Sequence, residues 1–290
     1  MKSEQDVYDV ILKIANEDER IRAVYMHGSR TKPSIEIDKY SNYDVVFVVT
    51  EINSFIENKD WINAFGDVVF VFEGLKNENM FFGKELNDLS RFYVWGMLFK
   101  DGSRIDLLAE VKDEAMKSKF TANKQTVVLL DKDGCLPKNA LLNNEVTSIK
   151  KPTEEKFIAC CYGFWWFLTD VAKAIARDQL PNAKARYNST IRLTLNQMID
   201  WHIGVQTDFS VSTGKREQYF KEHLSEDFYT LYAKTYSDSD YSNFWSAIFS
   251  GCELFSKVAS GVGDYFGFSY IRQSEINMMD YLTRVRNGIL

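Results

Sequence analysis

The sequence has little cysteine, proline and histidine, and it has no long apolar run. Its 290 residues include 4 Cys, 4 Pro and 3 His. The cysteines, at 135, 160, 161 and 252, lack the paired spacing of a structural zinc site, so we expect reduced thiols. No stretch approaches the roughly 18 apolar residues that cross a membrane, and the first residues lack the apolar core of a signal peptide. These absences predict a cytoplasmic protein.

Basic residues are not in excess either. The chain carries 35 Lys and Arg against 41 Asp and Glu, a formal net charge of −6. Broad nucleic-acid binding depends on a basic face that releases counterions from phosphates, so this balance disfavours DNA and RNA as partners. A small molecule is the favoured partner, and the composition leaves open whether the protein is a monomer or a homodimer.

Apolar residues, in contrast, are plentiful enough for two cores. They make up 45% of the chain, and aromatic residues make up 14%. A chain of this length suits two domains of roughly 150 residues each. Residues 131–153 collect Asp, Gly, Pro, Asn and Lys, which is typical of a linker. We therefore predict domains at 1–150 and 151–290.

The two halves differ in the spacing of their apolar residues. In the first half, β-branched and aromatic runs follow an amphipathic stretch at 4–16 and predict strands at 21–26, 45–49, 68–72, 93–99 and 104–111. In the second half, apolar residues recur every three or four positions and predict helices at 155–177, 188–203, 226–236 and 242–258. The expected fold class is α+β, with a mixed sheet flanked by helices followed by a helical bundle.

The segment His27-Gly28-Ser29-Arg30 follows the first predicted strand and precedes a loop. A glycine there lets backbone amides approach a phosphate closely, the Ser29 hydroxyl adds a donor, and Arg30 can balance negative charge. Taken alone, a Gly-Ser pair is usually only a turn. The segment gains meaning from the acidic residues that come after it.

Two carboxylates lie in strand sequence that is otherwise apolar. Asp44 begins the second predicted strand, and Asp106 lies within Ile105-Asp106-Leu107-Leu108. Carboxylates on neighbouring strands can hold Mg²⁺ together with triphosphate oxygens, and Asp106 could also accept the proton of an attacking hydroxyl. The simpler interpretation is that each Asp caps a strand end by a backbone or Arg hydrogen bond.

Together these residues resemble the nucleotidyltransferase superfamily that includes DNA polymerase β, with its Gly-Ser, Asp-x-Asp and third acid. The resemblance is closer to bacterial aminoglycoside 6-adenylyltransferases, the streptomycin-modifying resistance family. It extends in order over about two hundred residues and rests on Ser3-Glu4-Gln5, Asp18-Glu19-Arg20-Ile21-Arg22, Gly28-Ser29-Arg30-Thr31, Asn42-Tyr43-Asp44, Leu130-Asp131-Lys132-Asp133, Lys151-Pro152-Thr153, Trp201-His202-Ile203 and Gly214-Lys215.

The resemblance implies a catalytic N-terminal domain, a substrate-binding helical domain, and transfer of AMP from ATP to a hydroxyl of a small acceptor. It implies Mg²⁺ held at positions 42, 44 and 106, with Asp44 and Asp106 catalytic. It also implies that Gly28, Ser29, Arg30 and Lys215 bind the nucleotide. For Lys215 a solvated loop lysine is an equal alternative.

Two positions depart from the family pattern. Asn42 stands where the family has the first Asp of Asp-x-Asp, so one metal-binding carboxylate is missing and Mg²⁺ affinity should fall. Upstream of Trp201-His202, Lys184-Ala185-Arg186-Tyr187-Asn188-Ser189 is basic or neutral where the streptomycin enzymes are acidic. Like charge would disfavour a cationic drug, so we expect a different acceptor, neutral or anionic.

Asn42 also supports an alternative of another class. A catalytically weak or inactive homologue could bind nucleotide, or another small ligand, as a sensor. Transfer of a nucleotide to a protein or tRNA is disfavoured because the sequence has no basic stripe. His27 and His202 are expected to be structural residues.

Overall fold

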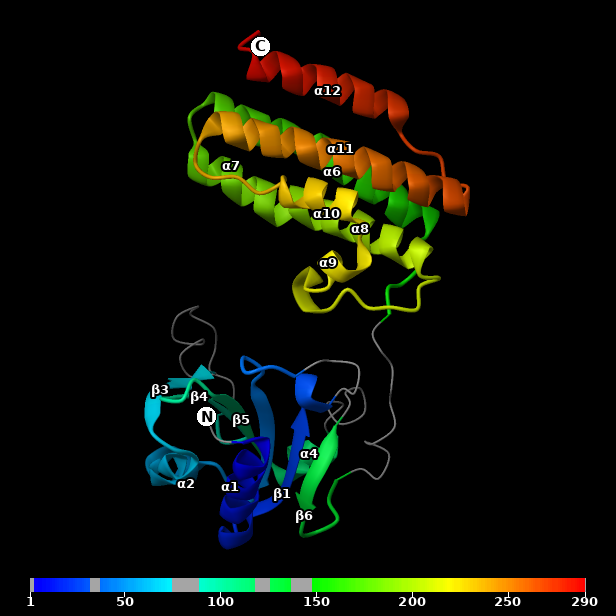
Figure 1. The fold of residues 1–290 in the computed structure, drawn as a ribbon. Coiled ribbons are helices and arrows are strands. Elements are labelled where there is room, and N and C mark those ends of the chain that lie inside the picture. Colours follow the sequence, from blue (N-terminus) through cyan, green and yellow to red (C-terminus); the bar gives the residue numbers. More distant parts are fainter. Residues whose placement is uncertain (1–2, 32–36, 75–88, 118–125, 137–147, 290) are drawn as a thin grey trace. The chain divides into compact units, whose positions relative to one another are not determined.

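The computed structural model describes residues 3–31, 37–74, 89–117, 126–136 and 148–289, and Figure 1 shows its elements. The chain divides into two compact units, Met1–Glu145 and Val146–Leu290. The first contains a sheet with helices and the second is helical, so the α+β prediction is confirmed. The assignment of a catalytic role to one unit and a substrate role to the other stays a prediction.

A six-stranded sheet in the order β3-β4-β5-β2-β1-β6 forms the first unit. β2 and β5 are parallel, and the other neighbours are antiparallel. The strands are β1 (Ile21–His27), β2 (Tyr43–Val49), β3 (Val68–Glu73), β4 (Phe92–Phe99), β5 (Arg104–Val111) and β6 (Val127–Asp131). The five predicted strands are confirmed, and β6 was missed because its apolar run of four residues leads directly into a polar turn.

Helical segments lie against both faces of this sheet. α1 (Glu4–Glu17) starts at a capping box in which Ser3 and Asp6 exchange hydrogen bonds with each other's backbone. Its buried residues join the larger core with α2 (Asn53–Glu57) and the 3₁₀ turn η2 (Asp60–Phe65). On the other face, Ala115 of α4 (Lys112–Lys117) joins a smaller core. Another 3₁₀ turn, η1 (Ser29–Thr31), follows β1.

The smaller core contains a polar pair that the sequence analysis did not anticipate. The Tyr25 hydroxyl donates to Glu110 Oε1 at 2.8 Å, across the intervening strand β2. Both side chains are buried, and burial raises the pKa of the Glu110 carboxyl above its usual value. The hydrogen bond from Tyr25 offsets part of the cost of burying this acid.

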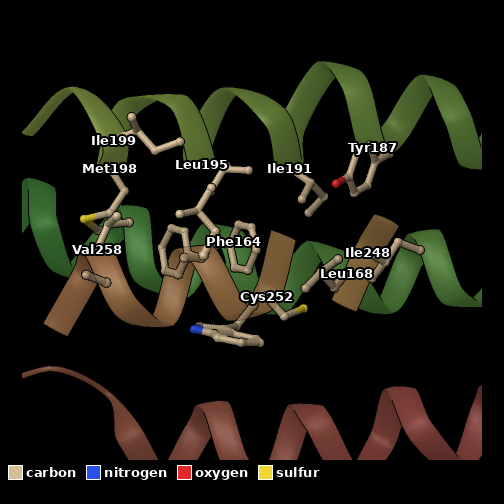
Figure 2. Packing of buried hydrophobic residues seen from close by; sticks show 14 of the residues in the cluster. Phe164, Leu168, Tyr187, Ile191, Leu195, Met198, Ile199, Ile248, Cys252 and Val258 are labelled. Carbon is tan, nitrogen blue, oxygen red and sulfur yellow. The ribbon is translucent and has the colours of Figure 1, made fainter. Parts of the chain in front are cut away.

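The second unit is a bundle around three long helices. Its elements are α6 (Glu154–Ala176), α7 (Leu180–Arg186), the π-helical turn η3 (Tyr187–Ile191), α8 (Arg192–Gln206), η4 (Lys215–Glu217), α9 (Phe220–His223), α10 (Glu226–Ala233), α11 (Tyr241–Phe266) and α12 (Arg272–Arg286). Figure 2 shows Phe164 of α6 next to Leu195 of α8 among the packed side chains of α6, α8 and α11. The rings of Phe164 and Phe255 stack at 3.9 Å between centroids.

Two helices differ from the prediction. α11 extends to Phe266, beyond the predicted end at residue 258. Gly263 is tolerated because it packs closely, and a Cβ there would lie 3.0 Å from the Phe268 carbonyl. α12 was missed because Leu282 is the one buried side chain among its described residues, so apolar periodicity is weak. The predicted linker at 131–153 lies partly outside the described residues, at 137–147.

None of the helices that the structure describes is both long enough and apolar enough to cross a membrane.

The stacked Phe164 ring should dominate the stability of the second unit. Phe164→Ala is expected to lower the free energy of unfolding by about 3–5 kcal/mol, because it removes a large apolar side chain and leaves a cavity. Phe167 is 42% exposed on the same helix, so Phe167→Ala serves as the control with a change within about 0.5 kcal/mol. Urea denaturation measures both. Equal losses would contradict this account of the core.

Candidate functional site

The pairing of five strands brings the predicted acids into one row across the sheet. His27 of β1 is opposite Asp44 of β2, and Asp44 is opposite Asp106 of β5. The row continues from Asp106 to Gly96 of β4 and from Gly96 to Phe72 of β3. Asp44 and Asp106 are 62 positions apart in the sequence. The parallel pairing of β2 and β5 makes them neighbours in the sheet.

A glycine at position 28 makes room for the first of these acids. Gly28 has a φ of +91°, and a Cβ placed on it would lie 2.0 Å from Asp44 Oδ2. The Asp44 carboxylate therefore occupies the space that any side chain at 28 would need. This contact explains the glycine at position 28, because the turn after β1 can pass the Asp44 carboxylate only without a side chain there.

The second acid, Asp106, is hydrogen-bonded on both of its oxygens. Asn42 Nδ2 donates to Asp106 Oδ2 at 3.2 Å, and Arg104 Nε donates to Asp106 Oδ1 at 2.9 Å. The three predicted metal positions are thus brought together: Asn42 contacts Asp106, and Asp106 is opposite Asp44 in the sheet. Arg104 was not singled out from the sequence, although alternation along a strand places it on the same face as Asp106.

Arg30 holds together the two segments that carry these groups. Its guanidinium donates to the carbonyls of Asn42 (3.1 Å) and Ser41 (2.9 Å), and it lies 3.8 Å from the centroid of the Tyr43 ring. It also pairs with Glu4 of α1 at 3.1 Å, and its side chain is only 7% exposed. In the structure Arg30 thus positions the loop before β2, while its predicted role as a phosphate ligand stays a prediction.

Ser29 opens the turn η1 directly after Gly28. The turn closes through Thr31, whose hydroxyl donates to the Gly28 carbonyl at 2.9 Å. The Ser29 side chain is only partly buried. Its position beside the Gly28–Asp44 contact agrees with a phosphate-binding turn, and that role also stays a prediction.

Lys215 lies in the second unit, where it is exposed at the start of η4. The loop before it is fixed to α8 by Thr213, whose hydroxyl donates to Asp200 Oδ1 at 2.7 Å. Burial is the main cause that raises the pKa of Asp200 to about 6. Gly214 follows with a φ of +78°, so this tether and the glycine together set the position of Lys215.

Beside η4 lies a pocket of about 400 Å³ lined by cationic and aromatic side chains. Arg192 donates to Thr235 Oγ1 at 3.0 Å and to the Thr235 carbonyl at 2.9 Å, and it lies 3.7 Å from the centroid of the Tyr236 ring. Arg192 Nε is buried and has no hydrogen-bond partner among the described residues. Arg216 and Lys221 add positive charge to the lining, and Glu217 adds one negative charge, so the lining stays net positive and favours an anionic ligand.

The basic segment upstream of Trp201 is engaged within its own unit. Lys184 Nζ donates to Ser237 Oγ at 2.6 Å and lies 3.8 Å from the centroid of the Phe244 ring. Arg186 pairs with Asp170 at 3.1 Å, so part of the positive charge of this segment is balanced. On α8, the ring of His202 packs against that of Phe228 with 5.0 Å between centroids, and burial lowers the pKa of His202.

The side-chain oxygens at the start of β2 and β5 decide whether Mg²⁺ fits there. Among the described residues, no group of three or more His, Cys, Asp or Glu side chains is arranged to hold a metal ion. Mg²⁺ is commonly held by one or two carboxylates together with substrate phosphates, and Asp44 and Asp106 supply such a pair. Asn42 turns its amide nitrogen toward Asp106, so it fits a cation only after the amide rotates to present oxygen.

Comparison with known proteins decides the family. A family model described as Streptomycin adenylyltransferase matches residues 1–285. The chain belongs to the streptomycin adenylyltransferase family. It is 35% identical over 272 residues to an aminoglycoside 6-adenylyltransferase of Bacillus subtilis (strain 168), covering 93% of each chain. It is 32% identical over 270 residues to one of Campylobacter jejuni, covering 93% of this chain and 91% of that protein.

A solved structure is also similar to this family member. The crystal structure of an aminoglycoside 6-adenyltransferase from Bacillus subtilis shares 29% sequence identity, with a TM-score of 0.47 over 99% of both chains. Membership of the streptomycin adenylyltransferase family rests on the sequence comparisons, which confirm the resemblance inferred from the motifs.

The Gly28–Asp44 contact can be tested with a matched pair of glycine variants. Gly28→Ala should displace the Asp44 carboxylate and reduce nucleotide transfer more than tenfold, because the new Cβ and Oδ2 cannot share one position. Gly102→Ala is the control, since Gly102 has a similar φ of +86° with nothing within 4 Å of its Cβ position. It should show only the backbone cost of about 1–2 kcal/mol in thermal unfolding. Equal activity in the two variants would contradict the assignment.

The buried Asp200 predicts a pH-dependent stability. Because its pKa is raised to about 6, ionisation is disfavoured in the folded state, and this opposes folding increasingly as pH rises from about 4 to about 6. Asp200→Asn keeps an acceptor for Thr213 and removes the charge. We expect it to raise the free energy of unfolding by about 1–2 kcal/mol at pH 7.5, with no gain at pH 3.5. A gain that is the same at both pH values would contradict this interpretation.

Proposed function

We propose that the protein transfers AMP from ATP to a hydroxyl group of a small acceptor, with Mg²⁺ bound at Asp44 and Asp106. One observation carries this proposal. Asp44 and Asp106 lie side by side in the sheet, next to a turn in which the Asp44 carboxylate leaves room only for a glycine. Family membership supports the reaction class, because the curated relatives are named aminoglycoside 6-adenylyltransferases. Magnesium, when bound, would neutralise triphosphate charge and stabilise the charge that develops at the α-phosphate.

The residues of the chain have separate parts in this reaction. The backbone of Gly28 and the Ser29 hydroxyl would hold triphosphate oxygens, and Arg30 would keep their turn in place against Asn42. The acceptor hydroxyl oxygen attacks the α-phosphorus, the bond from that phosphorus to the bridging oxygen breaks, and pyrophosphate leaves. Asp106 accepts the hydroxyl proton, because a carboxylate oxygen keeps a lone pair beyond the one that binds a cation.

We assign Lys215 to nucleotide binding as well. The support lies in the second unit, where the cationic pocket lined by Arg192, Arg216 and Lys221 adjoins the turn that carries Lys215. A cluster of guanidinium and ammonium groups with aromatic rings suits phosphate oxygens better than it suits a cationic drug.

The acceptor is proposed to be a hydroxylated molecule that is less cationic than streptomycin. The segment 184–189 contains no carboxylate, so it offers no charge partner to a guanidinium group. The ion pair between Arg186 and Asp170 and the contacts of Lys184 reduce the repulsion expected from the sequence alone. The missing attraction, rather than like-charge repulsion, is therefore the stronger argument for a changed acceptor.

Asn42 gives a second candidate function a specific basis. Because its amide donates a hydrogen bond to Asp106, the site is assembled without the third carboxylate of the family pattern. A homologue of this kind could bind nucleotide as a sensor and transfer it weakly or not at all. Turnover measurements on variants separate the two candidates.

For an active enzyme, Asp106→Asn should reduce kcat for AMP transfer from radiolabelled ATP by about 10²–10³-fold, because a charged ligand and proton acceptor is lost. Asn42→Asp should raise kcat at saturating Mg²⁺, because it restores the missing charge. The sensor alternative is favoured if the wild-type protein and Asn42→Asp both lack turnover while nucleotide binding persists. The Phe167→Ala variant serves as the control for nonspecific effects of mutation.

Acceptor preference needs its own measurement. Initial rates with streptomycin should be lower than with uncharged or anionic polyols of similar size at equal concentration. Replacing Ala185 by Asp should raise kcat/KM for streptomycin several-fold, because it supplies a carboxylate in the segment that has none. Efficient adenylylation of streptomycin by the wild-type protein would overturn the proposed change of acceptor.

A further inference from the structure

Both oxygens of the Asp106 carboxylate accept hydrogen bonds from other side chains of the protein. Arg104 Nε donates to Oδ1 at 2.9 Å, and Asn42 Nδ2 donates to Oδ2 at 3.2 Å. One of these partners carries a full positive charge, and the other stands where the family has an acid. Asp106 is therefore neutralised by the chain itself.

Arg104 contacts the Asp106 carboxylate but is exposed enough to move away from it. Arg104 and Asp106 are separated by one residue on β5, so both side chains project from the same face of the sheet. The Arg104 side chain is 54% exposed, whereas that of Asp106 is 24% exposed. The guanidinium can thus move into solvent without opening the core, while the carboxylate stays at its place in the row.

A divalent cation and Arg104 compete for the same negative charge. A cation that binds Asp106 approaches the oxygens that now accept from Arg104 and Asn42, and it experiences repulsion from the guanidinium at short range. A carboxylate at position 42 would add attraction for the cation and hold it against this repulsion. Asn42 adds none, so the effect of Arg104 is larger in this chain.

We propose that Arg104 is a positioning residue that acts as an internal counter-ion of Asp106 and must move away before a divalent cation can bind there. The inference rests on the proposed function in that it takes Asp106 as a metal ligand. It goes further because it predicts that Arg104 weakens the binding of a divalent cation in the absence of substrate. The missing acid at position 42 would then be only one of two causes.

Mn²⁺ binding to the full chain, measured by the electron paramagnetic resonance signal of free Mn²⁺ without nucleotide, tests this proposal. Arg104→Gln should tighten Mn²⁺ binding about three- to tenfold, because it removes the competing charge. Arg104→Lys keeps the charge and should stay within about twofold of the wild-type Kd. Circular dichroism checks that each variant is folded.

Two further variants make the result specific. Arg91 pairs with Glu114 elsewhere in the same unit, so Arg91→Gln changes the net charge equally and should leave Mn²⁺ affinity unchanged. Adding Asp106→Asn to Arg104→Gln should abolish the gain. The proposal is overturned if Arg104→Gln fails to tighten binding, if Arg91→Gln tightens it equally, or if the gain persists without Asp106.

The test is separable from the proposed function. Tightening in Arg104→Gln of a protein that transfers no nucleotide would retain this inference and remove the proposed reaction. Unchanged Mn²⁺ binding in a protein that transfers AMP would retain the reaction and overturn the role of Arg104.

Discussion

The close approach of Gly28 to the Asp44 carboxylate constrains the other residues of the candidate site, where the central strands β2 and β5 begin. Antiparallel pairing of β1 and β2 brings the turn after His27 past the start of β2, and only a residue without a side chain fits there. Parallel pairing of β2 and β5 then fixes Asp106 beside Asp44. Arg30 links the same turn to the loop before β2 by hydrogen bonds to the carbonyls of Ser41 and Asn42. The positions of Gly28, the two acids and Asn42 therefore depend on one another.

Negative charge at this end of the central strands is partly balanced by the protein itself. Two acids remain of the three that the family pattern implies, and one of the two is already paired with Arg104. The protein therefore holds a preformed arrangement whose net negative charge is small. In the proposed reaction, nucleotide phosphates would therefore supply a larger share of the negative charge and of the metal ligands than they would with an aspartate at position 42.

Much of this arrangement could be predicted from the sequence, because the signals were local. β-branched and aromatic runs marked the strands of the row, and Gly28, Asp44 and Asp106 stood out as a glycine and two acids in or beside apolar strands. The strand β6 escaped because its apolar run is short. The partners of Asp106 and of Asp200 could not be identified by pattern alone, since a hydrogen bond from Thr213 across a loop depends on tertiary packing. The two-residue spacing of Arg104 and Asp106 indicated that they share one face of β5. It did not show that their side chains form a hydrogen bond.

We propose that Gly28, Asp44 and Asp106 together bind a nucleotide and a divalent cation. Isothermal titration of the wild-type protein with a non-hydrolysable ATP analogue, with and without Mg²⁺, tests it most directly when Asp44→Ala and Asp106→Ala are titrated alongside. The account predicts binding that requires Mg²⁺ and is lost in both variants. Binding that is indifferent to Mg²⁺, or that survives both substitutions, would contradict it.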